Sequence, residues 1–240
     1  VHEIRVHPRD NDLIVATHGR ALWILDDAAP VQQMNAQVAA KAAHLFPLRA
    51  TTRFNTGGGE WSWGSQAYKG TNAPYGAAIT YWLKDKPAAD SLVKVEIVAN
   101  GSVIRTIKKP SAAAGFNRVT WDLRYEAPKV LSDMPPDSSE PGDWRSRPAG
   151  PQALPGSYTV RLTLNGQAQE QPLTIRIDPS AGVAMATLQT QFEQAQRLNA
   201  VITNLIDTER NLVAFRGQVD ERSNSGTEMR GDAPRELVKA

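Results

Sequence analysis

Residues 156–177 have the sequence GSYTVRLTLNGQAQEQPLTIRI, and this stretch contains the clearest structural pattern in the chain. Apolar side chains alternate with polar ones on both sides of Asn165-Gly166, which predicts two β-strands that each turn one face toward a hydrophobic core. An Asn-Gly pair favours the two-residue turn of a β-hairpin, because both of its positions take a positive φ. The segment therefore predicts an antiparallel hairpin in a β-rich domain.

The same alternation occurs upstream, from residue 77 onward. A second Asn-Gly pair, Asn100-Gly101, lies between two of the alternating segments and predicts a second hairpin. About six strands in roughly 100 residues, or seven if an earlier segment joins them, are typical of a β-sandwich of the immunoglobulin or fibronectin type. We therefore expect such a sandwich over residues 77–178. Its strands are expected around residues 79–83, 93–97, 103–107, 119–123, 158–164 and 173–177.

A long segment without alternation interrupts this region at residues 126–155. From residue 132 it is rich in Pro, Ser and Asp, which favour turns over strands. Loops of this length inside a domain are usually functional or mobile. We expect a long loop between two strands of the sandwich, with Trp144 covering an edge of the sandwich.

Residues 1–27 contain three short apolar segments separated by clusters of Asp, Asn, Gly and Pro. This pattern predicts a three-stranded antiparallel meander. A sheet of this size is too small to be stable alone. We therefore expect the meander to complete a sheet formed by sequence further upstream, in a longer protein of which this chain is a part.

Residues 28–76 are expected to connect the meander to the sandwich. An Ala- and Gln-rich, weakly helical segment comes first, and a glycine-rich loop follows. The aromatic side chains of this loop could form a platform that stacks on sugar rings or on a peptide. The favoured interpretation is that they are buried at the seam between the meander and the sandwich. They are Trp61, Trp63, Tyr68 and Tyr75.

The period of the apolar residues becomes helical in the last segment, residues 183–240. From about residue 185 to residue 222 they recur at steps of three and four, which predicts one long α-helix. Residues 223–226, with the sequence SNSG, are expected to end it. Basic and acidic residues are nearly balanced, so a lipid-binding face is not predicted. We expect the helix to be the first arm of a helical hairpin whose second arm lies outside this chain.

Charge and composition exclude several classes of function. The formal net charge is only +2, and no run of Lys or Arg is present that could follow a nucleic-acid backbone. No apolar run approaches the about 20 residues of a membrane-spanning helix. The chain has no cysteine, which excludes disulfides, thiolate zinc sites and a cysteine nucleophile. We therefore expect neither a nucleic-acid partner nor insertion into a membrane.

The sequence also lacks the patterns of a catalytic or cofactor site. Two aspartate pairs, Asp10/Asp12 and Asp26/Asp27, are candidates for the carboxylates of a glycosidase, but turn-forming aspartates are the preferred interpretation. Gly-x-Ser-x-Gly and a phosphate-binding glycine loop are absent. We therefore predict no catalytic residue, no cofactor and no metal. The histidines, whose spacing is not that of metal ligands, are His2, His7, His18 and His44.

Two stretches resemble known families. Residues 6–27, VHPRDNDLIVATHGRALWILDD, resemble the closing blade of secreted bacterial β-propellers with BNR (neuraminidase-type) or sortilin-type repeats, which are often labelled glycosyl hydrolases. In that family the stretch from Gly19 to Trp23 packs the blade. The Asp-box pattern S-x-D-x-G-x-x-W is absent here, since Gly19 and Trp23 stand four residues apart.

The second stretch contains the motifs G-x-N-x-x-x-W-D, with Gly115, Asn117, Trp121 and Asp122, and P-G-x-Y-x-V, with Pro155, Gly156, Tyr158 and Val160. It is similar to an Ig-like domain that also occurs in flagellar hook-capping proteins. By this resemblance the Trp anchors one sheet, the Tyr anchors the strand that returns beside it, and Pro-Gly sets the turn into that strand.

Together the resemblances imply a mainly β fold: the last strands of a propeller blade, an Ig/fibronectin-III-like β-sandwich and a long C-terminal α-helix. They imply an exported bacterial parent, periplasmic, secreted or at the cell surface. The expected role is that of a non-catalytic accessory region that braces the propeller and contacts its upstream blades. The alternative is a carbohydrate- or peptide-binding module of a sialidase-like propeller enzyme, in which any glycoside hydrolysis takes place in the upstream blades.

Overall fold

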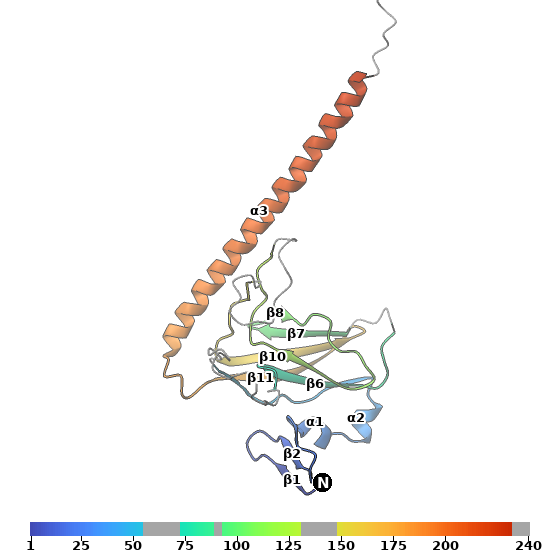
Figure 1. The fold of residues 1–240 in the computed structure, drawn as a ribbon, viewed down its shortest axis with the longest axis vertical. Helices are drawn as coiled ribbons and strands as arrows, with labels where there is room; N and C mark the ends of the chain where they lie inside the picture. The colour runs from blue at the N-terminus through green and yellow to red at the C-terminus, as the bar shows by residue number, and fades with distance from the viewer. Residues whose placement is uncertain (55–72, 89–92, 131–147, 232–240) are drawn as a thin grey trace, which may run out of the picture. The chain divides into compact units, whose positions relative to one another are not determined.

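The computed structural model describes residues 1–54, 73–88, 93–130 and 148–231, with side chains to residue 222. It contains several β-sheets and one long helix near the C-terminus, as the sequence predicts (Figure 1). The chain divides into two compact units. The first unit is Val1–Glu126 with Gln152–Phe192, and the second unit is Ala127–Pro151 with Glu193–Ala240. The predictions for Trp61, Trp63, Tyr68 and Trp144 lie outside the described residues.

The N-terminal meander of the first unit is a separate three-stranded antiparallel sheet, as expected. Two short helices follow it, and the side chain of Asn35 caps the second by accepting a hydrogen bond from Val38 N (2.9 Å). The elements are β1 (Glu3–Val6), β2 (Leu13–Ala16), β3 (Leu22–Leu25), α1 (Ala29–Gln32) and α2 (Ala36–Ala40).

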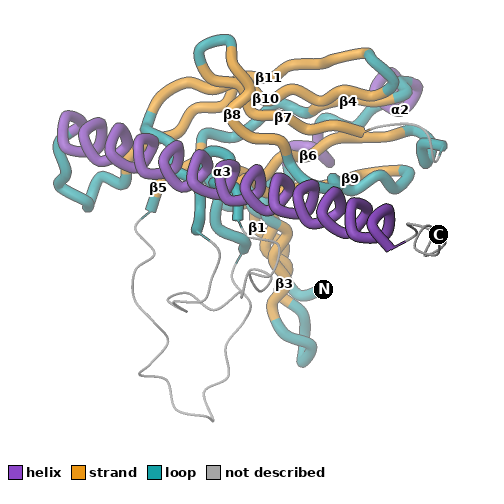
Figure 2. The backbone as a smooth tube through the Cα atoms, turned by 90° about the horizontal axis from the view of Figure 1, so that it is seen from above, coloured by secondary structure: helices purple, strands orange, loops and turns teal. Residues whose placement is uncertain are grey.

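Two further sheets enclose one hydrophobic core. The five-stranded sheet has the order β5-β11-β10-β7-β8, and the three-stranded sheet has the order β4-β6-β9. All strand pairs are antiparallel except β5 and β11, which run parallel. Figure 2 shows these strands in orange. They are β4 (Ala43–Leu45), β5 (Thr51–Arg53), β6 (Ala77–Leu83), β7 (Val93–Ala99), β8 (Ser102–Thr106), β9 (Gly115–Trp121), β10 (Gly156–Leu164) and β11 (Gln167–Ile177).

Both predicted Asn-Gly hairpins are confirmed. Asn100 and Gly101 have φ values of 50° and 77°, and they connect β7 to β8. Asn165 and Gly166 have φ values of 49° and 81°, and they connect β10 to β11. Two positive φ angles match the twist of the flanking strands, so the local sequence alone sets this pairing.

The core is organised around Trp121, which is fully buried. Its ring meets that of Tyr158 edge-on, with the centroids 5.5 Å apart, and its indole N–H donates to Arg124 O (2.7 Å). The two aromatic residues belong to different sheets, Trp121 to the three-stranded sheet and Tyr158 to the five-stranded sheet. They meet because each side chain points inward from its own sheet.

The strand expected around residues 119–123 ends earlier than predicted, at Trp121. Leu123 is fully buried, but its φ is +57°, so it lies outside the extended conformation. Its carbonyl accepts a hydrogen bond from Ala153 N (2.7 Å). The end of the long loop is therefore bonded to the core next to this bend.

The long helix α3 (Met185–Gly231) extends further than the sequence predicts. Residues 223–226 do not end it, and the helix includes them. The reason is energetic, since Ser and Asn cost only a few tenths of a kcal/mol in a helix and a single Gly about 1 kcal/mol. These costs do not stop a helix that continues on both sides.

A close approach of the backbone requires glycine at position 76, and this generates a stability prediction. Gly76 has a φ of +131°, and a Cβ there would lie 2.0 Å from Trp121 O. We expect Gly76→Ala to lower the free energy of unfolding by about 3 kcal/mol, from backbone strain together with displacement of β9. Gly166→Ala is the matched control, since φ is also positive (+81°) but no atom lies within 4 Å. Denaturant unfolding that shows equal losses for both variants would contradict this account.

The buried tyrosines generate a prediction for alkaline pH. Burial raises the pKa of Tyr81 to about 12, and it also raises the pKa of Tyr158. In the unfolded chain both phenols ionise near pH 10. The free energy of unfolding should therefore fall as the pH rises from about 10 to 12, because only the unfolded chain releases these protons. In denaturant titrations at several pH values, the free energy of unfolding of Tyr81→Phe should fall less steeply with pH than that of the unchanged protein. An equal pH slope for the two proteins would refute the conclusion that Tyr81 stays protonated in the folded state.

Candidate functional site

The β1–β2–β3 sheet has one side composed entirely of apolar side chains. Directly paired residues of neighbouring strands project to the same side of a sheet. Ile4 pairs with Val15, which pairs with Trp23, and the next row on this side is equally apolar. We call this side the apolar face, and its residues are Ile4, Val6, Leu13, Val15, Trp23 and Leu25.

The opposite side of the same sheet is apolar over two of its three strands. The pairing brings Ile14 beside Ile24, and Ala16 beside Leu22. Only β1 contributes charged residues there, and they neutralise one another, since Arg5 Nε lies 2.6 Å from Glu3 Oε1. Both sides of this small sheet therefore have the composition of a buried sheet rather than a surface sheet.

The side chains of β1 and β3 are nevertheless exposed, whereas those of the central strand β2 are half-buried. Trp23 and Leu22 are each 65% exposed, Ile24 is 62% exposed and Ile4 is 58% exposed. Within the described residues, β1 and β3 each pair only with β2, so the outer edge of each strand is open. An exposed apolar sheet with two open edges is characteristic of a surface that binds further protein.

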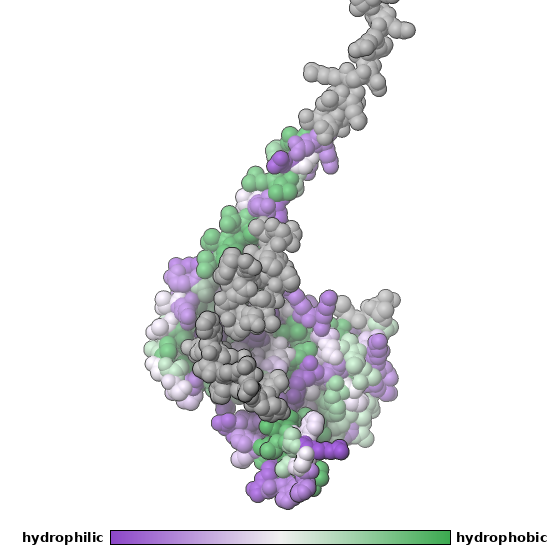
Figure 3. All heavy atoms as spheres, in the orientation of Figure 1, coloured by the Kyte–Doolittle hydropathy of each residue, from purple (hydrophilic) through white to green (hydrophobic). Residues whose placement is uncertain are grey.

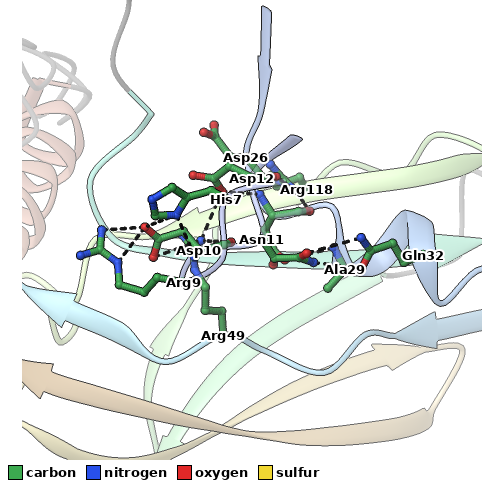
Figure 4. A network of polar contacts seen from close by, with 11 residues as sticks. His7, Arg9, Asp10, Asn11, Asp12, Asp26, Ala29, Gln32, Arg49 and Arg118 are labelled. Carbon is green, nitrogen blue, oxygen red and sulfur yellow. Dashed lines mark hydrogen bonds and ion pairs between the residues drawn. The ribbon is translucent and has the colours of Figure 1, made fainter. Parts of the chain in front are cut away.

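A group of polar contacts, which we call the junction, joins the turns of the meander to the rest of the first unit (Figure 4). Arg49 Nη1 donates to Asp10 O (2.5 Å) and lies 3.3 Å from Asp12 Oδ1. The same Oδ1 of Asp12 also accepts a hydrogen bond from Asp27 N (2.9 Å), which joins two turns within the meander. Asn11 Nδ2 donates to Gln32 Oε1 of α1 (3.0 Å).

Arg118, on β9, makes the junction's second connection to the sandwich sheets. Its Nη2 donates to Asp26 O (2.8 Å), and its Nε donates to Thr80 Oγ1 on β6 (3.1 Å). One guanidinium therefore bonds both the end of the meander and the three-stranded sheet. The planar fork of Arg suits such a bridge, because its donors point in fixed and different directions.

Three of the four aspartates of the meander, Asp10, Asp12 and Asp27, have side-chain contacts of the kind that turn residues make, as the sequence predicts. Asp27 Oδ1 accepts from Ala29 N (3.2 Å) at the start of α1, and Asp12 accepts a backbone N–H as described above. Hydrogen bonds from Arg9 lower the pKa of Asp10, and the charges of Arg49 and His7 lower it further. These carboxylates are thus already bonded to cations or to the main chain.

The residues singled out by the Ig-like motif lie in or beside the core. Asn117 is buried, and its amide Nδ2 donates to Ala113 O (2.7 Å) while Oδ1 accepts from Ser111 Oγ (2.7 Å). Tyr158 donates its hydroxyl hydrogen to Leu154 O (2.8 Å). Asp122 Oδ1 accepts from Arg124 N (3.1 Å), and Gly156 has a φ of +152°. All of these contacts support the fold.

The predicted blade residues Gly19 and Trp23 lie in the meander. Gly19 is in the β2–β3 turn with a φ of +75°, and the Trp23 indole N–H donates to Arg20 O (3.1 Å). Of the four aromatic residues of the connector, the described part of the chain includes Tyr75. Its hydroxyl donates to Phe54 O (3.2 Å), and its ring is half-buried against the core.

Sequence reasoning missed Arg49, Gln32 and Arg118, which hold the meander in place. They lie 21 to 92 positions away from the residues that they contact. No local pattern marks them, since the partners of each lie far away in the sequence.

His44 has an aromatic environment, and it is not part of the junction. Its ring lies edge-on to Phe46, with the centroids 4.8 Å apart, and burial lowers its pKa, with a smaller contribution from Lys41. In the described ranges no three His, Asp or Glu side chains gather in a way that could hold a metal ion. Across the same ranges no helix is long and apolar enough to cross a membrane.

Comparisons with protein-family models, with curated proteins and with solved structures found no match to this chain.

The junction generates a prediction about local stability. Arg118→Ala removes the bonds to Asp26 O and Thr80 Oγ1, which we expect to cost about 1 kcal/mol of local opening free energy. The amides of β2 should then exchange with deuterium about fivefold faster, while those of β10 should not change. Arg161→Ala is the control, because Arg161 contacts Glu170 on the five-stranded sheet. Equal exchange in β2 for both variants would contradict a role of Arg118 in holding the meander.

Proposed function

We propose that this chain is a non-catalytic accessory region of an exported bacterial β-propeller protein, and that its β1–β2–β3 sheet completes a propeller blade. The observation that supports this most directly is the exposure of apolar residues on both sides of that sheet, Trp23 and Leu22 included. Blades of a propeller are sheets packed around a common axis, so each blade has neighbours on its two faces. The open edges of β1 and β3 suit the addition of another strand of the same blade.

The junction explains how such a region braces the propeller. Arg49 and Arg118 bond the turns of the meander to a sandwich that has its own hydrophobic core. A blade that packs against the meander would thereby be attached to that core. The carboxylates of Asp10, Asp12 and Asp27 already bond to arginines or to the main chain, which favours a structural role over a catalytic one.

The sandwich supports the same assignment as an Ig/fibronectin-III-like module. Two sheets share one core, and the Tyr158 hydroxyl bonds to a carbonyl four residues upstream. This bond resembles the tyrosine corner of immunoglobulin-type sandwiches, in which a Tyr hydroxyl bonds back to the main chain. In this proposal α3 packs against another helix, either the second arm of a helical hairpin or a helix of another chain.

Hydrogen–deuterium exchange tests the proposal on two forms of the protein, the 240-residue chain and the complete product of its gene. In the complete product we expect the outer-edge amides of β1 and β3 to exchange at least tenfold more slowly, because a further strand or blade covers them. The amides of β10, which already lie between two strands, serve as the internal control.

Unchanged exchange of β1 and β3 in the complete product would overturn the proposal. So would a gene product that contains no β-strands beyond those described here.

A further inference from the structure

Helix α3 carries an exposed apolar row that repeats every seven residues. Leu198, Leu205, Leu212 and Val219 occupy one position of the repeat. The position three residues later is filled, in the same order, by Val201, Thr208, Phe215 and Arg222. We call these eight residues the heptad row, and all of them lie in the second unit.

The row is exposed along its whole length. Leu198, Val201, Leu205, Leu212 and Phe215 are each between 61% and 66% exposed, and Val219 is 49% exposed. Figure 3 shows hydrophobic residues on the described turns of this helix. Exposed apolar residues at random positions are common, but six exposed apolar residues in one heptad register, interrupted by Thr208 and followed by Arg222, mark a contact surface.

A different side of α3 is already occupied within the second unit. Lys129 Nζ lies 2.7 Å from Asp207 Oδ2, and Arg210 Nη2 donates to Val130 O (2.9 Å). Ile206 is buried on this side, with an exposure of 9%. The contacts of Lys129 and Val130 therefore lie on the side of α3 that carries Asp207 and Arg210, whereas the apolar residues of the heptad row are exposed.

We propose that α3 pairs with α3 of a second copy of this chain as an antiparallel two-stranded coiled coil along the heptad row. A row that repeats every 3.5 residues on average faces a partner helix continuously when the two helices supercoil. The row from Leu198 to Val219 covers about 33 Å of helix at 1.5 Å per residue.

Charge complementarity selects both the partner and its direction. Glu209 and Arg216 occupy the same flanking position in successive heptads, next to the row. When two copies run antiparallel about a two-fold axis beside Val213, Glu209 of each copy lies next to Arg216 of the other. Two ion pairs form in this arrangement, and such flanking pairs set the orientation of coiled coils. Arg216 also lies 3.7 Å from Asp220 of its own helix, so this arrangement would place its guanidinium between two carboxylates.

A parallel arrangement lacks this match. In register, it would place Arg222 of one copy against Arg222 of the other inside the seam, which is a repulsive contact. In the antiparallel arrangement Arg222 faces Leu205, where its aliphatic part can pack while the guanidinium reaches water. Leu212 of one copy meets Phe215 of the other at the centre. The row is thus complementary to itself, which favours a second copy over an unrelated helix.

The oligomeric state of the full 240-residue chain tests this proposal. Light scattering coupled to size exclusion should give twice the mass of one chain at tens of micromolar. Leu212→Glu should raise the dissociation constant at least 100-fold, because it places charges in the centre of the seam. Val213→Glu is the matched control, since Val213 is 60% exposed on the same helix but lies outside the row. Both side chains are exposed in the single chain, so neither variant should unfold it.

A charge exchange tests the direction of the helices. Glu209→Arg and Arg216→Glu should each weaken dimerisation about tenfold, and the double variant should restore it. In a parallel dimer the two residues do not meet, so restoration would not occur.

Cross-linking gives a second, independent measurement of direction. The chain has no cysteine, so Glu209→Cys and Arg216→Cys each introduce the only thiol. An oxidised cross-link should form rapidly when the two variants are mixed and slowly in either variant alone.

A monomer at all concentrations would overturn the proposal and would favour a partner of different sequence for the heptad row. Equal effects of Leu212→Glu and Val213→Glu would also overturn it. Failure of both the charge exchange and the mixed cross-link would overturn the antiparallel arrangement.

Discussion

The contact between Trp121 and Tyr158 is the interaction on which the first unit depends. It joins the two sheets through the largest side chain of the core, at a position from which water is fully excluded. The polar atoms of both rings are bonded to main-chain carbonyls, at Arg124 and Leu154, so the burial leaves no donor unpaired on either ring. The bends that begin and end the long loop are thereby attached to the same aromatic pair.

The meander has a different physical basis, since the apolar side chains of its outer strands β1 and β3 are exposed. Its attachment is polar and comes from two arginines and one glutamine that lie far from it in the sequence. A sheet that is apolar on both sides, and that is oriented by polar bonds at its turns, can present both of those sides to other protein. The all-apolar sequence of β3, Leu22–Leu25, suits the proposed role, in which neighbouring propeller blades cover both faces of the sheet.

Local features of the structure could be predicted from the sequence, and non-local ones could not. The hairpins at Asn100-Gly101 and Asn165-Gly166 follow from two adjacent residues, and the burial of Ile79, Tyr81 and Leu83 on β6 follows from alternation, whereas the burial of Thr80 does not. The strands β4 and β5 have three residues each, too few to establish a period, and the parallel pairing of β5 depends on contacts more than 100 residues away. The junction escaped prediction for the same reason, since the long-range contacts of Arg118 have no local signature. The aromatic ligand-binding hypothesis remains a prediction.

The position of β11 between β5 and β10 has a consequence for biosynthesis. Thr51 pairs with Ile175, and the backbone of β4 is bonded by the side chains of Gln169 and Gln171, so early strands need partners that are made last. Contacts between segments so distant along the chain form late, because a long loop must close first. During translation β5 therefore has no strand partner until the ribosome has released β11, and the inner face of the three-stranded sheet stays uncovered by β10 and β11 until then. This exposes its apolar segments to chaperones and to aggregation for longer than a locally paired domain would.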